Sequence, residues 1–473
     1  MEFVVDSIQW SLLLYFVVLN AGYLALNLLA FRELSRCMQT RTLETLPQVY
    51  SGLEIPISLI VPAYNEETTI VTSIQSLLQL NYPEFEVLVV NDGSKDKTLE
   101  VMKREFDLEL MPEAFRLRVD CKPVRGVYRS KTHPNLRVID KENGHGKADA
   151  LNAGINGARF PLFCSLDADS VLQRDALHRV VLPFLEDSRT VAAGGIIRLL
   201  NGCDVSNGFL TRAGLPRNPL AIIQVVEYLR AFLFGRLGWS PMNAVLCISG
   251  AFGLFHKETV IAAGGFRTDT VGEDMELVMR LHRLLRHQGK PYRIVCVPDP
   301  VCWTEAPESR RVLRSQRVRW QRGLAESLSL NRQLLFSKKG GVLGWVAFPF
   351  AVLFEFLSPI VELAGYLFFA VGLAFGVVSL ESTLAFLGIA IGVGMVLSIT
   401  GLLLEEMAFH VYPRMTDILI LLLAVVLENF GYRQMNGVWR LVGLWQWATG
   451  KKAVWGDMTR TATWQRDPVG LRH

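Results

Sequence analysis

Two aspartates, Asp167 and Asp169, follow directly after a short apolar run at 162–166. Side chains two residues apart on an extended strand end point to the same side, so the two carboxylates can share a ligand. Paired carboxylate oxygens suit Mg²⁺ or Mn²⁺, especially where the phosphates of a substrate complete the coordination shell. The pair predicts a metal site beside a diphosphate, although Asp169 and Ser170 would also suit the cap of a following helix.

Two further polar clusters follow apolar runs in the same way. The sequence PAYNEE at 62–67 comes directly after the first run, and NDGS at 91–94 comes after the second. Taken singly, an Asp-Gly pair after a strand usually indicates only a turn. Three such clusters at the carboxyl ends of neighbouring strands instead predict a ligand site at one edge of a sheet.

The elements that would position these clusters alternate along the chain. Apolar runs predict strands at 57–61, 86–90, 136–139 and 162–166. Helical spacing of apolar residues predicts helices at 68–80, 95–106 and 147–155. Strands of nearly continuous apolar character are buried on both faces, so we expect a doubly wound α/β domain with a mostly parallel sheet.

Later segments add more polar candidates. Lys147 opens a predicted helix after a GHG sequence, where backbone N–H groups and a lysine favour a phosphate. Ser249 and Gly250 precede another apolar strand, and Glu273 and Asp274 precede a predicted helix at 275–286. Asp274 would also serve as an ordinary N-cap of that helix.

An arginine-rich stretch contains Gln316, Arg317, Arg319 and Trp320 in the sequence QRVRW. The 473-residue chain has a formal net charge of only +4, so we do not expect a nucleic acid as partner. Contacts to lipid head groups or to a diphosphate need fewer assumptions. For Trp320 the alternative is a residue that only packs its helix.

Several function classes are excluded by missing motifs. The sequence has no GxxxxGK[ST] segment and no GxGxxG after the first strand, which argues against a P-loop enzyme and a dinucleotide enzyme. Its seven cysteines include no CxxC pair, so neither a zinc site nor a disulfide framework is indicated.

Apolar runs at both ends predict a membrane protein. The run at 10–31 carries no charge, and roughly 20 residues suffice to cross a bilayer. A signal peptide is the alternative, but acidic residues precede this run and arginines follow it, which favours an anchor with the next domain in the cytoplasm. Further runs lie at 341–380, 382–404 and 418–427, and Pro359 could divide the first into two spans or mark a re-entrant piece.

The tail after these runs is basic and contains half of the ten tryptophans. Four C-terminal spans would return it to the cytoplasm, as the positive-inside rule favours, whereas three would leave it outside. We expect an amphipathic helix at the membrane interface, with packing on the soluble domain as the alternative. The tail tryptophans are Trp439, Trp445, Trp447, Trp455 and Trp464.

Glu355 and Glu362 are ionisable residues in an otherwise apolar run. Such residues are costly in a membrane unless they face a cavity or a partner. They are seven residues apart and would share one face of an unbroken helix, although Pro359 lies between them. We expect them either to line a translocation path or to pair with basic residues and fix the packing.

With DxD, ED and QxxRW in this order, the chain resembles the processive, membrane-embedded family 2 glycosyltransferases, which make cellulose, chitin, hyaluronan and poly-N-acetylglucosamine. The resemblance covers about 55–323, and the sequences GKADALN at 146–152 and SGA at 249–251 are most similar to the poly-β-1,6-N-acetylglucosamine synthases. It implies a GT-A fold, a UDP-sugar donor and a Mg²⁺ or Mn²⁺ ion. Unlike the longer cellulose synthases, the chain contains no visible cyclic-dinucleotide module.

The resemblance also implies roles for single residues. Asp274, assisted by Glu273, would be the general base, and Asp169 with Asp167 would hold the metal. Trp320, Ser249 and Gly250 would bind the acceptor. The donor would be bound by Ala63, Tyr64, Glu66, Asp92, Lys147, Asp167, Gln316 and Arg319.

The implied organisation is a multi-pass protein of the inner (plasma) membrane with a cytoplasmic catalytic domain. It comprises an anchor at 1–35, a GT-A domain at 50–330, membrane helices at 341–430 and an interfacial tail at 431–473. Its expected partners are a UDP-sugar, a polysaccharide acceptor, the lipid bilayer and small membrane or export subunits, with no nucleic acid. The alternatives are transfer of one sugar to a lipid acceptor and an inactive subunit of an envelope complex.

Overall fold

The computed structural model describes residues 2–44, 54–112, 115–206, 208–409, 411–412 and 414–451. Trp455, Trp464 and the rest of the predicted tail beyond 451 lie outside the described residues. The chain divides into two compact units. The α/β unit comprises Thr40–Pro216 and Val245–Ala306, and the helical unit comprises Met1–Gln39, Arg217–Ala244 and Pro307–Lys452.

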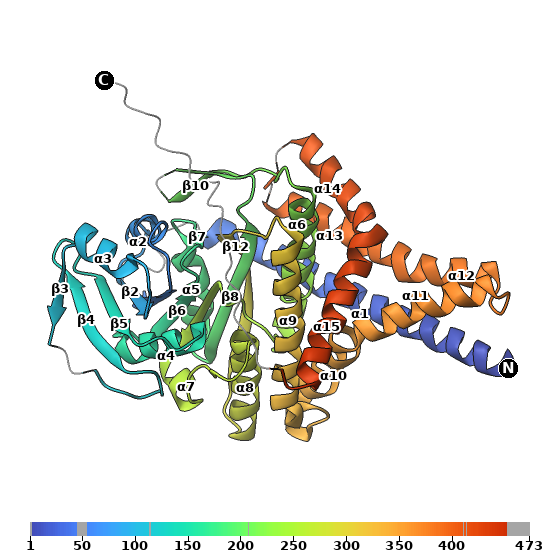
Figure 1. Ribbon diagram of the computed structural model, residues 1–473, viewed down its shortest axis with the longest axis horizontal. Coiled ribbons are helices and arrows are strands. Elements are labelled where there is room, and N and C mark those ends of the chain that lie inside the picture. The colour runs from blue at the N-terminus through green and yellow to red at the C-terminus, as the bar shows by residue number, and fades with distance from the viewer. Residues whose placement is uncertain are drawn as a thin grey trace. The chain divides into compact units, whose positions relative to one another are not determined.

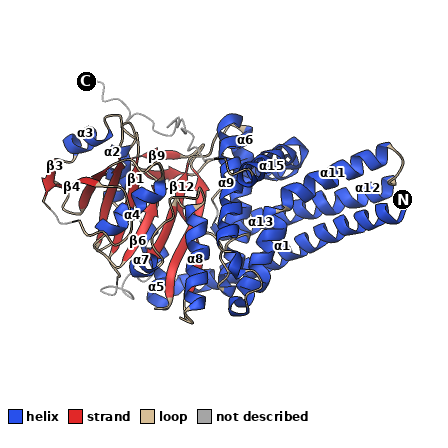
Figure 2. Ribbon diagram, turned by 60° about the horizontal axis from the view of Figure 1, so that its bottom comes forward, coloured by secondary structure: helices blue, strands red, loops and turns tan. Residues whose placement is uncertain are grey.

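A parallel four-stranded core forms the centre of the α/β unit, in the order β5-β2-β1-β6 (Figure 1). These strands are almost wholly buried because helices flank the sheet on both faces, as Figure 2 shows. The strands are β1 (Ile57–Ala63), β2 (Phe85–Asp92), β5 (Leu136–Lys141) and β6 (Leu162–Leu166). The first helices are α2 (Ile70–Leu78), α3 (Thr98–Glu105), α4 (Lys147–Gly157) and α5 (Ala176–Glu186).

Antiparallel strands extend this core, and the described residues form a ten-stranded sheet in the order β3-β4-β5-β2-β1-β6-β11-β8-β12-β7. The added strands are β3 (Leu108–Met111), β4 (Val124–Ser130), β7 (Val171–Leu172), β8 (Thr190–Leu199), β11 (Phe252–His256) and β12 (Arg293–Thr304). A separate ribbon pairs β9 (Asp204–Ser206) with β10 (Phe209–Arg212), and the remaining helices are α7 (Lys257–Ala262) and α8 (Glu273–His287).

The predicted α/β fold of the GT-A class is therefore confirmed. The sheet is mixed: it is parallel at its centre and between β8 and β12, and antiparallel where β3, β4, β7 and β11 join. β3 and β4 escaped the sequence pattern because they are short or half-exposed, so their side chains do not form continuous apolar runs.

The helical unit is assembled from three separated stretches of chain. Its main helices are α1 (Glu2–Glu44), α6 (Pro219–Leu229), α9 (Arg310–Leu330), α11 (Ser358–Ala374), α12 (Leu380–Leu387), α13 (Gly394–Phe409), α14 (Met415–Leu427) and α15 (Arg433–Ala448). Short π-helical turns interrupt or join them at Arg230–Phe234, Leu343–Ala347, Ala351–Phe356, Gly388–Val393 and Glu428–Tyr432. The remaining short helices are Leu237–Met242, Arg332–Leu334, Lys338–Gly340 and α10 (Phe348–Phe350).

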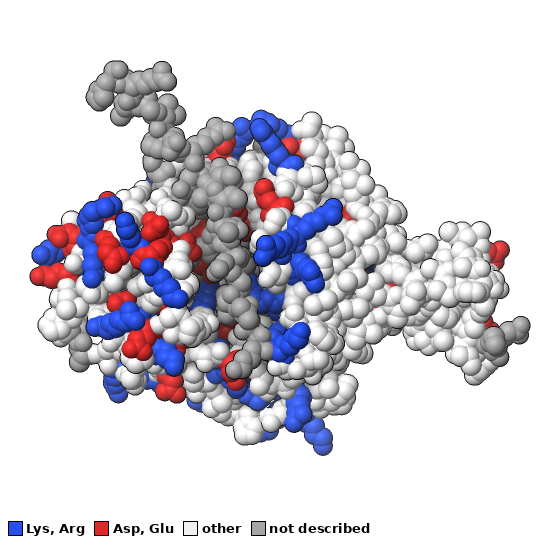
Figure 3. Space-filling model, in the orientation of Figure 1, with Lys and Arg blue, Asp and Glu red and all other residues white. Residues whose placement is uncertain are grey.

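Several helices of this unit are long and apolar enough to cross a membrane. The described residues contain three such candidates, Phe3–Cys37, Leu380–Glu406 and Met415–Ala448, or four if a bent pair is one span. That pair, Leu343–Phe356 and Ser358–Ala374, bends by 48° next to Pro359, where the sequence predicted a division. Figure 3 shows almost no charged residues on the visible face of α11 and α12.

The expected four C-terminal spans are not found in the described residues, which hold two candidates, or three with the bent pair. α14 has only 13 residues, about 20 Å of helix, whereas the hydrocarbon core measures about 30 Å. It joins α15 across a non-helical break at Phe430 and Gly431 to form one candidate. α15 packs against α9, with Trp439 buried beside Leu313.

The N-terminal helix α1 is bonded to distant parts of the helical unit. The Tyr15 hydroxyl donates a hydrogen bond to the Leu353 carbonyl at 2.9 Å. Asn20 Nδ2 donates to the Ile389 carbonyl at 3.0 Å, within the π-helical turn that precedes α13. A Cβ atom at Gly22 would lie 2.5 Å from a ring carbon of Phe350, so α1 and α10 approach each other closely there.

Candidate active site

A lysine and an aspartate meet where β6 ends and α4 begins. Lys147 is the first residue of α4, and its ammonium group forms an ion pair with Asp167, the residue directly after β6. Burial lowers the pKa of Lys147, but the charge and hydrogen bond of Asp167 outweigh it, so the pKa is raised overall. Lys147 therefore remains a cation at any physiological pH.

The backbone of Gly250 connects this pair to Asp274. Lys147 Nζ donates a hydrogen bond to the Gly250 carbonyl at 2.7 Å, and the Gly250 amide donates to Asp274 Oδ2 at 2.9 Å. A Cβ atom at Gly250 would lie 3.4 Å from Asp274 Oδ2 and 3.6 Å from Lys147 Nζ. The structure thus brings Lys147, Asp167, Gly250 and Asp274 together from four separate segments, and their roles in binding and catalysis stay predictions.

Asp274 is delivered to this point by the N-terminal end of α8. It is the second residue of that helix, and its Oδ1 accepts a hydrogen bond from the Met275 amide at 2.8 Å. Its neighbour Glu273 points into the protein and is 7% exposed. Of these two predicted catalytic acids, Asp274 has the more accessible carboxylate.

The loops after β1 and β2 are tied to each other. The Asn65 amide donates to Ser94 Oγ at 3.1 Å, and the Lys95 amide donates to Asn65 Oδ1 at 2.9 Å. The Glu66 amide donates to Thr98 Oγ1 at 2.9 Å. These hydrogen bonds fix the segment formed by the end of β1 and the loop after it, where three of the predicted donor-binding residues lie.

Those three residues differ in accessibility. Ala63 ends β1 and is buried, whereas the Tyr64 side chain is 41% exposed and can meet a ligand. Glu66 Oε2 accepts a hydrogen bond from Thr69 Oγ1 at 2.7 Å, which orients its carboxylate.

Asp92 belongs to a buried charge network that the sequence reasoning missed. Its Oδ1 is bonded by Lys141 Nζ and by the Gly144 amide, the latter at 3.0 Å. Lys141 also forms an ion pair with Asp149 at 2.6 Å and is itself fully buried. The missed signal was a lysine at the end of the apolar strand β5, where a charge needs a partner.

Gly93, the residue directly after Asp92, lies where two loops approach each other closely. Gly93 has φ +65°, and a Cβ atom there would lie 2.7 Å from the Asn143 amide nitrogen. A glycine is therefore required for the loop after β2 to approach the loop that leads into α4.

Two family models, both of glycosyltransferases, match parts of this chain. Residues 58–212 match the family model of glycosyl transferase family 2, and residues 162–379 match that of glycosyl transferase family group 2. Most of the α/β unit is therefore similar to family 2 glycosyltransferases. The predicted family resemblance is thereby confirmed.

Proteins similar to this chain include poly-β-1,6-N-acetyl-D-glucosamine synthases. The Staphylococcus epidermidis protein is 30% identical over 272 residues, which is 58% of this chain and 55% of the relative. The Staphylococcus aureus (strain COL) protein is 31% identical over 274 residues, with the same two coverages. The chain thus matches about half the length of these curated relatives.

Solved structures with a similar fold include two glycosyltransferases. A Pyrobaculum calidifontis mannosyltransferase in complex with GDP-Man and Mn²⁺ is 18% identical, with a TM-score of 0.49 over 93% of this chain and 100% of that chain. Residues 1–349 of S. aureus TarS in complex with UDP-GlcNAc are 16% identical, with a TM-score of 0.39 over 84% of this chain and 92% of that chain.

The acidic residues directly after β6 suit a divalent metal ion only if a substrate supplies further ligands. The described residues contain no group of three or more His, Cys, Asp or Glu side chains arranged around one point. Asp167 and Asp169, both half-buried, offer the hard oxygen donors that Mg²⁺ and Mn²⁺ prefer. Such a pair suits an ion whose remaining ligands come from a substrate's phosphates and from water.

The remaining predicted site residues divide between the two units. Ser249 lies in the α/β unit, where its Oγ accepts a hydrogen bond from the Ala251 amide at 3.4 Å. Gln316, Arg319 and Trp320 lie on α9 in the helical unit. Gln316 is 8% exposed and Trp320 is 42% exposed, which disfavours a pure packing role for the tryptophan. The approach of Trp320 to Asp274 stays a prediction.

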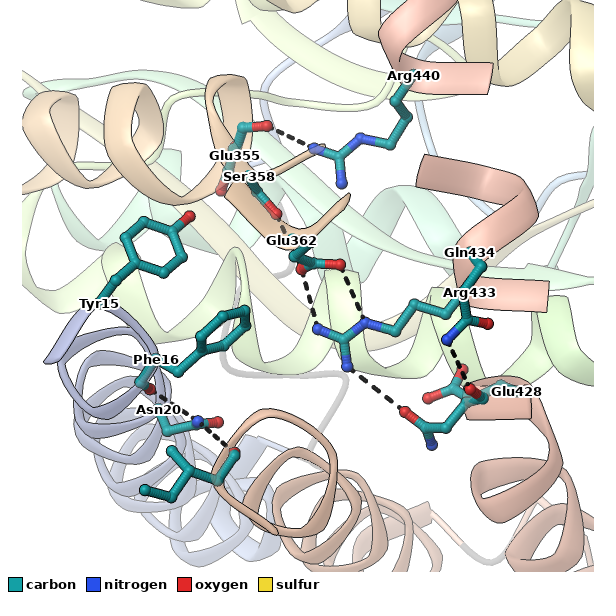
Figure 4. Close-up of polar contacts among 12 residues, drawn as sticks. Tyr15, Phe16, Asn20, Glu355, Ser358, Glu362, Glu428, Arg433, Gln434 and Arg440 are labelled. Atoms are coloured by element: carbon teal, nitrogen blue, oxygen red, sulfur yellow. Dashed lines mark hydrogen bonds and ion pairs between the residues drawn. The ribbon is translucent and has the colours of Figure 1, made fainter. Parts of the chain in front are cut away.

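The two glutamates of the apolar run have basic neighbours (Figure 4). Arg433 donates two hydrogen bonds to the Glu362 carboxylate, at 3.0 and 3.3 Å, and Ser358 Oγ donates a third at 3.0 Å. Arg440 Nη2 donates to the backbone carbonyl of Glu355 at 2.5 Å. For Glu362 the structure supports the packing alternative over the lining of a translocation path.

Proposed function

We propose that this protein transfers N-acetylglucosamine from its UDP-activated form to a growing β-linked polysaccharide, with inversion at the anomeric carbon, and exports the chain. The proposal is supported by the family 2 domain and by the likeness to poly-β-1,6-N-acetyl-D-glucosamine synthases over 272 residues. The observation that carries it is the convergence of Lys147, Asp167 and Asp274 around the Gly250 backbone.

In this reaction Asp274 acts as the general base. Its carboxylate removes the proton from the acceptor hydroxyl as that oxygen attacks the anomeric carbon, and UDP departs on the opposite side. The hydrogen bond from the Gly250 amide holds Oδ2 in place without neutralising it, because the amide keeps its hydrogen and does not protonate the carboxylate. Glu273 supports this end of α8 from the buried side.

The departing diphosphate gains negative charge, which cations must offset. Lys147, whose raised pKa keeps it protonated, supplies one positive charge, and Arg319 supplies another. Asp169 and Asp167 would hold a Mg²⁺ or Mn²⁺ ion, which as a Lewis acid would stabilise the same charge. Gln316, on the preceding turn of α9, is the other donor-binding residue of that helix.

Donor and acceptor are bound by different sets of residues. The uridine lies on Ala63, Tyr64 and Glu66, and the uracil meets Asp92. The acceptor sugar stacks its apolar face on Trp320, since an indole ring is a suitable platform for C–H groups. The Ser249 hydroxyl and the Gly250 backbone fix the hydroxyls of the acceptor.

The apolar helices suit an enzyme of the inner (plasma) membrane. UDP-sugars are made in the cytoplasm, so the catalytic domain faces that side and the product crosses the bilayer. The nearly uncharged visible face of α11 and α12 and the candidate spans support this assignment.

A donor panel tests the proposal. Membranes that contain the protein are incubated with radiolabelled UDP-N-acetylglucosamine, UDP-glucose or UDP-galactose, with Mg²⁺, Mn²⁺ or excess EDTA, and the products are sized. We expect a polymer from UDP-N-acetylglucosamine that EDTA abolishes. A single-sugar lipid product would replace the polymer reading, and no turnover of any donor would leave an inactive subunit.

A further inference from the structure

The exposed indole of Trp320 rests on a buried arginine. The Arg317 guanidinium lies over the Trp320 ring, with Cζ 4.4 Å from the ring centroid. Arg317 is 6% exposed, whereas Trp320 is 42% exposed. One face of the indole is thus covered from inside the protein, and the tryptophan is supported as well as displayed.

Arg317 is itself held by a carboxylate on another helix. Its Nη2 forms an ion pair at 2.5 Å with Oε2 of Glu227, which lies on α6. The Tyr432 hydroxyl donates a hydrogen bond to the same oxygen at 2.8 Å, and Asn436 Nδ2 donates to Oε1 at 3.4 Å. Glu227 therefore connects α6, α9 and the start of α15.

A second aromatic residue completes the support. Tyr228, the neighbour of Glu227 on α6, has its ring centroid 6.3 Å from that of Trp320, with the planes at 51°. An ion pair this deeply buried is costly unless its geometry is fully satisfied, so it is poor evidence for stability alone. A role in holding one side chain in one orientation explains it better.

We propose that Arg317, fixed by Glu227, is a positioning residue that sets the orientation of the Trp320 indole for the acceptor sugar. The inference rests on the proposed function, because it assigns an acceptor to Trp320. Loss of the cation beneath the ring frees the indole to rotate, which weakens acceptor binding and leaves the donor site intact.

The test separates acceptor use from donor use. Purified protein is assayed with UDP-N-acetylglucosamine, once with a β-linked N-acetylglucosamine oligosaccharide as acceptor and once with water alone. Arg317→Met should raise the acceptor KM about tenfold, as expected for a desolvated cation–π contact of about 1–2 kcal/mol. Donor hydrolysis should stay within about twofold of the wild type, and Arg317→Lys should recover most of the acceptor affinity.

A double-mutant cycle provides the decisive comparison. In a Trp320→Ala background, Arg317→Met should add almost no further loss, because the side chain that it positions is gone. Arg332→Met, an exposed arginine just beyond the end of α9, is the matched control and should behave as wild type.

Two outcomes would overturn the inference: additive losses in the cycle, or an equal fall in donor hydrolysis and transfer by Arg317→Met. If Arg317→Met does not fold, Glu227→Gln and Arg317→Lys carry the same test, with melting temperatures as a check. Wild-type protein that turns over no UDP-sugar would instead defeat the proposed function, a result that is distinct from either outcome above.

Discussion

Ion pairs are arranged differently in the two units of this protein. In the α/β unit they join loops at one edge of the sheet, as Lys147 does with Asp167. In the helical unit they join helices that are distant in sequence, for example Arg230 with Glu428, 198 residues apart. In the proposed function the first arrangement brings reacting groups together, whereas the second holds apolar helices together.

The surroundings explain why the two arrangements respond differently to mutation. The Asp167 side chain is 35% exposed, so water and ligands can replace a lost partner. The Glu362 side chain is 12% exposed within an apolar run, so removal of its partner leaves a charge that nothing else solvates. The comparison predicts that substitutions in the first group affect the reaction and those in the second affect folding.

Asp274→Asn should have the largest effect on activity and almost none on stability. The amide keeps the shape of the side chain but cannot accept a proton, so we expect sugar transfer to fall about 10²–10⁴-fold. Polymer yield and the melting temperature should be measured together. Asp269→Asn, which removes an exposed partner of Arg267, is the matched control and should retain activity.

Arg433→Met should show the opposite pattern. It strands the Glu362 carboxylate in the helical unit, so we expect a loss of about 3–5 kcal/mol in unfolding free energy and low yields from membranes. The double variant Arg433→Met/Glu362→Gln should recover a large part of this loss. If the single variant were as stable as the wild type, the Arg433–Glu362 ion pair would not hold the helices together.

Lys141→Met tests whether the α/β unit also contains a buried ion pair that stabilises the fold. Lys141 is fully buried between Asp92 and Asp149, so its loss should destabilise the unit by about 3 kcal/mol and also weaken donor binding through Asp92. The check is a denaturation curve together with the KM for UDP-N-acetylglucosamine. A changed KM with unchanged stability would indicate that Lys141 acts in donor binding and does not stabilise the fold.

The smallest of these effects, counted for each pH unit, is that of pH on stability. His282 in the α/β unit is buried against Tyr292 and the Val245 carbonyl, and burial lowers its pKa to about 3. The unfolded chain binds this proton below about pH 6.5, so stability should fall by about 1.4 kcal/mol per pH unit from there towards pH 3. His282→Gln should flatten this slope in pH-dependent thermal melts, and an unchanged slope would mean that other groups cause it.

The sequence predicted the neighbouring residues of the candidate site better than it predicted the ion pairs that join helices. Lys147, Asp167 and Asp274 follow or precede recognisable elements, so the geometry of an α/β sheet brings them together without further information. The Glu227–Arg317 pair depends on how two helices pack, which no local spacing specifies. Four C-terminal spans were expected because apolar runs and charge bias do not show that α14 and α15 form one candidate span.

The bonds between α1 and the rest of the helical unit limit how this enzyme can be prepared. A shortened chain that lacks the first forty residues would strip the donors from the carbonyls of Leu353 and Ile389 and uncover the Phe350 ring. Such a truncation should aggregate instead of dissolving, so biochemical work calls for the intact polypeptide in detergent or nanodiscs.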